Sequence, residues 1–144
     1  MISMTQTREF ERVAPDGTAA TTFTLAAGTT DVNSAPIDLQ ASHGATVVIA
    51  LGTITATGTY TATIEHSDAS GSGYTAISGL SAAINADTDD NKLLVIDVVD
   101  PVKRYIRVVS DRGTANSVID SIIAIKKRRY APVTQGATVE AVDL

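Results

Sequence analysis

The chain has 144 residues, no Cys and no Trp, and a formal net charge of −5 at pH 7. Its length suits one domain, and the missing Cys excludes a thiol nucleophile, a zinc ribbon and a disulfide framework. No apolar run approaches the roughly 18 residues of a membrane-spanning helix, and charges interrupt the N-terminus where a secretory signal would be apolar.

The chain has 21 Ala, 20 Thr and 10 Gly; Thr together with Val and Ile favours strands, and Gly favours turns. Residues 1–18 are expected to form an extended N-terminal arm, which ends at the turn signal Pro15-Asp16-Gly17. Residues 21–25 alternate between apolar and polar side chains and predict a strand. Residues 27–40 are predicted to form a loop, and residues 44–55 are rich in β-branched side chains and predict another strand.

The middle of the chain continues this pattern. Residues 59–66 alternate strictly, which predicts a hairpin partner for the preceding strand, and residues 74–77 predict a short strand. Residues 79–91 are the least regular stretch of the sequence. Residues 92–99 form a nearly continuous apolar run, as expected for a strand that is covered on both faces or lies at the centre of a sheet.

Two further strands are predicted at residues 103–110 and 118–125. Pro132 prevents the chain from continuing as a central strand, so residues 132–144 are expected to form a polar C-terminal tail. Seven or eight strands separated by turns predict an all-β sandwich or barrel, which would occupy residues 19–131.

No catalytic constellation, cofactor motif or metal-binding motif is found. Counted from Asp87, a calcium loop of the EF-hand type would need Gly at its sixth and Glu at its twelfth position, where the chain has Lys92 and Val98. An irregular cation site in residues 87–91 stays open as an alternative to a solvated loop. His43 and His66 do not have the spacing of a metal motif, and no GxSxG segment marks a nucleophile.

The charges are distributed unevenly along the chain. Residues 1–91 carry two basic and ten acidic side chains, whereas residues 92–130 carry nine basic and four acidic ones. This split indicates either a basic patch or strands whose outer faces are simply solvated. Nucleic-acid binding is not expected, because the isoelectric point is about 4.8 and only Tyr105 and Tyr130 accompany the basic stretch. The four consecutive cations at residues 126–129 are better suited to docking onto an acidic protein surface than to binding nucleic acid.

Both termini carry side chains that could anchor a protein partner. Extended arms can wrap a partner surface at a cost in ordering entropy, and the alternative is plain terminal disorder. The candidate contact residues combine the N-terminal arm with the basic-aromatic segment near the C-terminus: Arg8, Phe10, Arg12, Lys126, Lys127, Arg128, Arg129, Tyr130 and Pro132.

Five segments occur together in an order that resembles the capsid decoration, or cement, proteins of tailed bacteriophages. They are a strand with the sequence IEHSD, a GSGY turn, a KRYIRV strand, an apolar strand and a closing basic-aromatic-Pro segment, at residues 64–68, 71–74, 103–108, 118–125 and 128–132. The resemblance covers roughly residues 44–133. The combination carries it, because a similar hairpin also occurs in carbohydrate-binding sandwiches.

The resemblance implies an antiparallel β-sandwich of jelly-roll type that binds the exterior of an assembled capsid and covers the junctions between capsomers. The implied partners are the major capsid protein and further copies of the chain, as a dimer or trimer, with no nucleic acid, membrane, cofactor or catalysis. Such a protein is made in the host cytoplasm and resides on the virion. The alternatives are a carbohydrate- or receptor-binding sandwich of a tail or fibre, a connector or tail component with the same fold, and an enzyme.

Overall fold

The computed structural model describes residues 7–17, 22–113 and 117–130, together with 133, 135–136 and 138–139. These residues form ten strands and a four-residue helical turn, α1 (Ala86–Asp89). The strands are β1 (Arg8–Val13), β2 (Leu25–Gly28), β3 (Val32–Asn33), β4 (Ile37–Asp38), β5 (Ser42–Ile54), β6 (Thr59–Ser67), β7 (Thr75–Asn85), β8 (Leu93–Val99), β9 (Tyr105–Asp111) and β10 (Ser117–Arg128).

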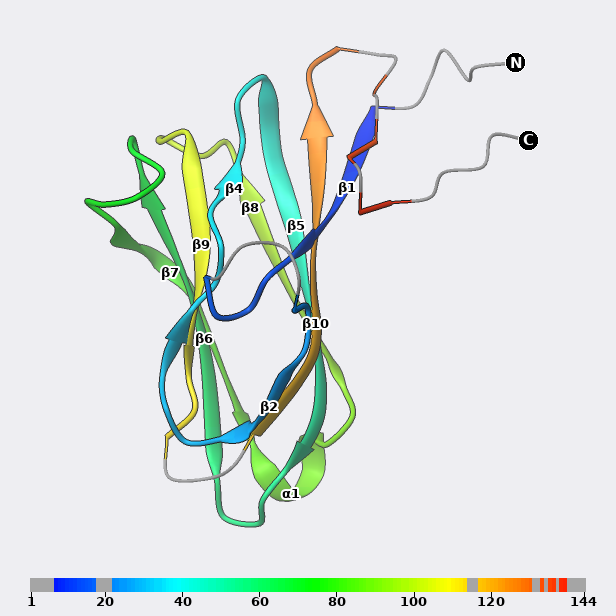
Figure 1. Cartoon of the computed structure of the whole chain (residues 1–144). Coiled ribbons are helices and arrows are strands. Elements are labelled where there is room, and N and C mark those ends of the chain that lie inside the picture. Colours follow the sequence, from blue (N-terminus) through cyan, green and yellow to red (C-terminus); the bar gives the residue numbers. More distant parts are fainter. Residues whose placement is uncertain are drawn as a thin grey trace.

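The strands are arranged in two antiparallel sheets that face each other (Figure 1). Sheet A has the order β1-β10-β5-β8, with β2 also paired to β10. Sheet B has the order β3-β9-β6-β7, with β4 also paired to β9. The predicted all-β sandwich is therefore confirmed.

The core lies between the sheets and follows from the alternation of side chains along each strand. Every second residue of β5 from Ala45 to Leu51 points inwards, and the same period holds for the inner sides of β6 and β9. Leu, Ile and Val dominate this interior, and Tyr60 is its largest fully buried side chain. The central members are Val47, Ile49, Ile64, Ile106, Val108, Ile119 and Ile122.

The predicted strands at residues 44–55, 59–66, 103–110 and 118–125 correspond closely to β5, β6, β9 and β10. In the predicted loop, residues 27–40, the end of β2 and the short strands β3 and β4 are found instead. The irregular stretch is also ordered, because β7 continues to Asn85 along β6. Leu80, Ala82 and Ile84 of this strand pack against the core, but the small Gly, Ser and Ala residues weaken the apolar alternation in the sequence.

The apolar run before the turn at Asp100 forms β8, an edge strand, and not the doubly covered strand that was predicted. Ile96 and Val98 are buried, whereas Leu93, Val95 and Val99 are 65%, 57% and 70% exposed. The reason is that the described residues form only two layers, so the outer side of sheet A, to which these three side chains point, is not covered. One apolar side of this strand therefore stays open among the described residues.

The structure also differs from the predicted domain organisation at the N-terminus. The described part of the expected arm forms β1, which pairs with β10 from Arg8 opposite Lys127 to Val13 opposite Ile122. Part of the predicted C-terminal tail lies along the other edge of β1 (Figure 1). The Phe10 amide donates to Gln135 Oε1 at 2.8 Å, and Gln135 Nε2 donates to the Arg8 carbonyl at 2.8 Å. The sandwich therefore begins at Arg8, because Val13 on the inner side of β1 completes the core.

Burial of Tyr60 should make the free energy of unfolding fall as the pH becomes alkaline. Its hydroxyl lies 2.9 Å from Ser110 Oγ, and burial raises the pKa of Tyr60 from 10.0 to about 12. The unfolded chain loses the phenol proton first, so the free energy of unfolding should fall by about 2–3 kcal/mol between pH 10 and 12. Urea unfolding across this range should show a shallower fall for Tyr60→Phe than for the wild type. Equal slopes in the two proteins would contradict this assignment.

Candidate docking surface

Sheet A presents apolar side chains on its outer side as well as its inner side. Val95 lies opposite Val48, Val48 lies opposite Ile123, and Ile125 lies opposite Phe10, so the four main strands all contribute. Leu93, Val95 and Val99 are well exposed, and the others are half-buried. We call this surface the outer apolar face: Phe10, Val48, Ala50, Leu93, Val95, Val99, Ile123 and Ile125.

Charged side chains stand on the same side of sheet A around these apolar groups. Lys127 Nζ lies 3.1 Å from Asp97 Oδ1 across the face. A hydrogen bond from Thr46 and a second one from Lys127 hold the pKa of the exposed Asp97 below its ordinary value. On β1, the guanidinium of Arg12 stacks 4.5 Å from the centre of the Phe23 ring, and Arg8 is exposed. The face therefore has an apolar centre and a rim that is mostly basic.

The four consecutive cations do not form one patch, because successive residues of a strand point to opposite faces. Lys126 points inwards and is buried, with its Nζ 2.7 Å from Glu9 Oε1 and 2.9 Å from Glu11 Oε2. Arg128 Nε lies 3.2 Å from Glu9 Oε2. Only Lys127 of these three points to the outer side, where Asp97 already pairs with it. Lys126 therefore lacks the exposure that a direct contact residue needs.

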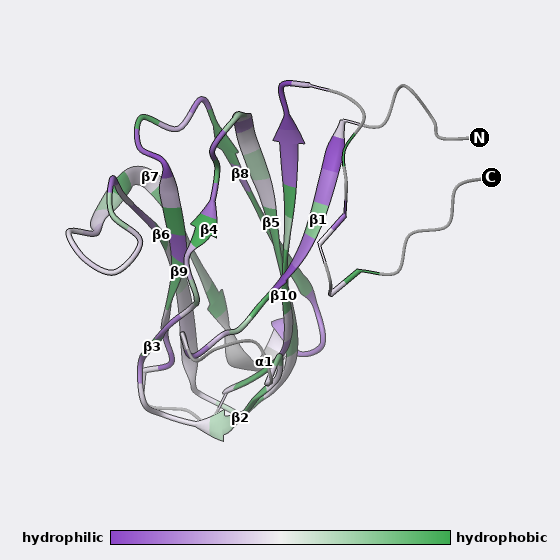
Figure 2. Cartoon of the chain, turned by 45° about the horizontal axis from the view of Figure 1, so that its top comes forward, coloured by the Kyte–Doolittle hydropathy of each residue, from purple (hydrophilic) through white to green (hydrophobic). Residues whose placement is uncertain are grey.

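Of the remaining predicted contact residues, Arg8, Phe10 and Arg12 belong to β1, and Arg129 and Tyr130 follow the end of β10, which is hydrophilic (Figure 2). Arg129 is exposed, and its Nε donates to the Ser42 carbonyl at 3.4 Å. Tyr130 is 76% exposed. Pro132 lies outside the described residues. The structure therefore brings Arg8, Phe10 and Arg12 onto the outer side of sheet A, with Arg129 and Tyr130 at its end.

The ion cluster around Lys126 closes the end of the core next to β1. Burial lowers the pKa of Lys126, but hydrogen bonds with Glu9 and Glu11 outweigh this effect and raise the pKa above its ordinary value. The ammonium therefore stays charged, and its contribution to stability is lost only as the pH rises through that raised pKa. The two glutamates come from β1, so this strand supplies both apolar and ionic contacts to β10.

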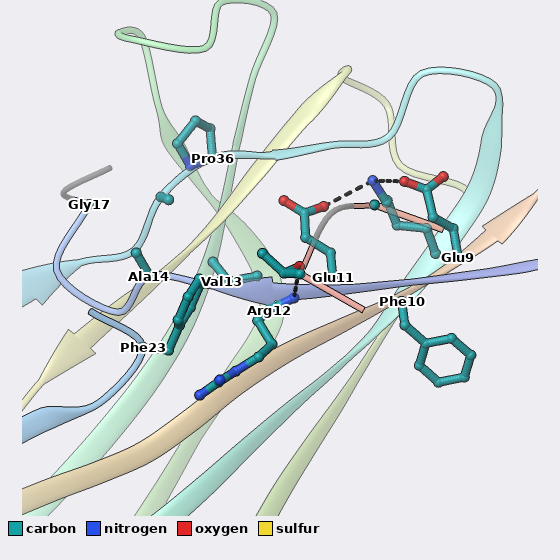
Figure 3. Close-up of a pocket in the computed structure, with 13 residues that line it drawn as sticks. Glu9, Phe10, Glu11, Arg12, Val13, Ala14, Gly17, Phe23 and Pro36 are labelled. Carbon is teal, nitrogen blue, oxygen red and sulfur yellow. Dashed lines mark hydrogen bonds and ion pairs between the residues drawn. The ribbon is translucent and has the colours of Figure 1, made fainter. Parts of the chain in front are cut away.

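A cavity of about 600 Å³ lies beside β1 (Figure 3). Its walls include Glu11, Phe23, Pro36 and Lys126. The Glu9 and Glu11 carboxylates both contact the Lys126 ammonium. Figure 3 shows that the Phe10 ring points away from these two carboxylates. The cavity therefore combines an aromatic wall with neutralised charges, and it borders the outer apolar face at Phe10.

Acidic side chains of the predicted loop at residues 87–91 form contacts that hold neighbouring segments together. Asp90 Oδ1 accepts a hydrogen bond from the Ile54 amide at 2.9 Å, and Asp89 pairs with Lys92 at 2.8 Å. The two histidines lie in different sheets, His43 in β5 and His66 in β6. No group of three or more metal-ligating side chains occurs within the part of the chain that the structure describes. Within that same part, no helix has the length and apolarity to cross a bilayer.

The sequence pattern of residues 92–99 does not predict the open side of β8. An unbroken apolar run predicts burial, and its length and period are the same for a central strand and for an edge strand that exposes one side. The usable signal is that residues 122–125 are also apolar at consecutive positions, which gives a second strand of the same sheet two apolar sides. Two such runs in one sheet require either a covering layer or a partner.

Comparison with known proteins gives no match to a family model, a curated protein or a solved structure. The function of the chain therefore has to be inferred from its sequence and from the geometry of its surfaces. Of these surfaces, the outer apolar face is the one whose exposure in an isolated copy is costly, because apolar area remains in contact with water.

Two adjacent lysines provide a matched test of the ion cluster. Replacing Lys126 by Ala leaves Glu9 and Glu11 without their shared cation and should lower the free energy of unfolding by about 3 kcal/mol. Replacing Lys127 by Ala removes an exposed pair and should cost less than about 1 kcal/mol. Urea unfolding at pH 7 measures both values. Similar losses for the two variants would show that burial of Lys126 does not distinguish them.

Proposed function

We propose that this chain is a structural virion protein that binds the outer surface of an assembled phage capsid and stabilises the junctions between capsomers. The observation that carries the proposal is the outer apolar face, which three strands and the N-terminal strand β1 build together. Large contiguous apolar patches on soluble domains mark interaction sites. The resemblance of residues 44–133 to capsid decoration proteins supplies the class of partner.

The chemistry of the face suits a protein surface. Protein interfaces have an apolar centre surrounded by a polar rim, and aromatic residues and Arg are enriched in them. Phe10 and the Val and Ile side chains form such a centre, and Arg8 and Arg12 lie at its β1 border. Neither arginine forms a salt bridge within the described residues. The capsid surface that fits them is apolar at the contact and acidic around it, and the charges would set orientation and association rate.

The succession of strands supports the jelly-roll interpretation of the sandwich. Along the chain, the six strands from β5 to β10 belong in turn to sheets A, B, B, A, B and A. Two interlocked Greek keys produce such crossings in a jelly roll, a fold found in viral capsid domains. Each sheet then keeps one free outer side, and in sheet A this side is apolar.

Binding of this kind depends on repetition. A capsid offers the same site many times, and a decoration protein with more than one copy can engage several sites together. A modest interface for each copy is then sufficient, because the effective concentration of the second site replaces tight binding at the first. Chain copies would therefore cross the boundary between neighbouring capsomers and hold them together.

A second candidate function is a carbohydrate-binding module of a tail or fibre. The cavity beside β1 favours it, because Phe23 and Glu11 together offer the aromatic wall and carboxylate that sugar sites use. We expect no binding in a glycan array, because Arg12 already stacks on the Phe23 ring. Array binding that Phe23→Ala abolishes would favour this second candidate over the capsid.

Capsid binding should depend on the outer apolar face. Ile125→Asp and Phe10→Ala alter the centre of this face, and each should weaken co-sedimentation with assembled capsids of the encoding phage by at least about tenfold. Ala83→Asp, on the exposed side of β7 in sheet B, is the matched control and should bind like the wild type. Circular dichroism melts verify that all three variants are folded. Normal co-sedimentation of both face variants would refute the assignment of this surface.

A further inference from the structure

The edge of sheet A at β8 is open, in contrast to the other edges of the sandwich. Side chains of the C-terminal segment bond to β1, β3 and β4 have only two residues each, and the pairing of β7 with β6 shifts between Thr63 and Glu65. By contrast, β8 pairs with β5 over seven residues without a bulge. Long regular edges without a protecting feature readily pair with another strand.

The backbone of β8 has a defined orientation towards this open edge. The Leu51 amide donates to the Lys92 carbonyl at 3.0 Å, and the Asp100 amide donates to the His43 carbonyl at 2.9 Å. Even-numbered residues from 92 to 100 therefore turn their backbone groups towards β5. In an antiparallel ladder the intervening residues turn theirs the other way. Residues 93, 95, 97 and 99 thus direct amides and carbonyls to an edge that has no second strand among the described residues.

We propose that β8 pairs in antiparallel orientation with β8 of a second copy of this chain, about a two-fold axis at Ile96. This register places residue 93 opposite residue 99 of the other copy and residue 95 opposite residue 97. All outward-facing backbone groups of the strand are then paired. The two A sheets become one continuous sheet, and the two outer apolar faces lie side by side.

The charged residues at and near β8 favour a second copy of this chain as the strand that pairs with the open edge. They also favour this register over a shifted one. Continuing the ladder by one residue at each end brings Lys92 opposite Asp100 of the other copy, and the symmetry repeats this pair. Asp100 forms no salt bridge within the described residues, and the existing contact of Lys92 with Asp89 is exposed. A register two residues further along would place Asp97 opposite itself, and facing like charges are destabilising. The pairing at Ile96 therefore joins opposite charges and separates like ones.

The apolar side chains of the two β8 strands also lie opposite each other in this register. The exposed Leu93 would meet the exposed Val99 of the other copy on the outer side of the joined sheet. On the inner side, the half-buried Leu94 would meet Val98, and Ile96 would meet its own copy. A single strand pair buries less area than a standard interface of about 1,600 Å² in total. The dimer is therefore weak in dilute solution and forms as protomer concentration rises.

The first test removes one outward-facing amide while leaving the monomer intact. Val95→Pro lacks the N–H that the second copy needs, and Pro is tolerated on an edge strand when its N–H would face outwards. Val95→Thr keeps the amide and is the matched control. In sedimentation velocity from about 10 to 500 µM, wild type and Val95→Thr should dimerise, and Val95→Pro should associate at least about tenfold more weakly. A wild type that stays monomeric throughout, or a Val95→Pro variant that dimerises normally, overturns the proposal.

The second test examines the register and remains decisive if Val95→Pro fails to fold. Lys92→Glu places two carboxylates opposite each other and should weaken the dimer about tenfold. In the D100N background, the same substitution should change the dissociation constant by no more than about twofold. Asn is the suitable replacement because residue 100 has a φ of 45°. An equal loss in both backgrounds overturns the register. These experiments use the protein without capsids, so their outcome is independent of the proposed capsid binding.

Discussion

The position of β10 between β1 and β5 is the constraint on which the rest of the sandwich depends. Its inner side supplies Ile119, Ile122 and Ala124 to the core. Its outer side contributes Ile123 and Ile125 to the outer apolar face. Because β10 pairs with three other strands, it also determines where β1 and β2 can lie. Without this strand, sheet A would consist only of the β5–β8 pair and would have no surface broad enough to serve as a docking face.

The change from apolar to ionic side chains along the inner side of β10 gives the pairing its register. A slip of β1 by one residue would turn its glutamates outwards and place Arg8 or Arg12 beside the buried Lys126. Such a slip would leave a buried cation next to another cation, which is strongly unfavourable. The cluster therefore contributes to the specificity of the fold, and it explains why the N-terminal segment is part of the sheet although it is rich in charge.

The parts of the fold that could be predicted from the sequence are those in which a local pattern corresponds to one environment. Residues 59–66 alternate strictly and form β6, with one side in the core. The segment that became β1 has a charge at four of its six positions and resembles a solvated arm, because Lys126, the partner of Glu9 and Glu11, is more than 100 residues away. For β8, hydrophobicity indicated burial on both faces. Whether a further layer covers its outer face depends on how the strands are arranged in the two sheets. The alternation of the basic run between two faces follows from strand geometry, whereas its acidic partners require the tertiary structure.

The pairing of the first described strand with the last one also has a consequence for the timing of folding. Arg8 lies opposite Lys127, so sheet A cannot close until β10 has been synthesised. During translation, β1 and β5 emerge before β10. Their apolar side chains therefore have no β10 to pack against until that strand has been synthesised. Contacts between such distant residues make folding slow and expose aggregation-prone intermediates. Closure of sheet A by the pairing of its two most distant strands is therefore a late step in the folding of this chain.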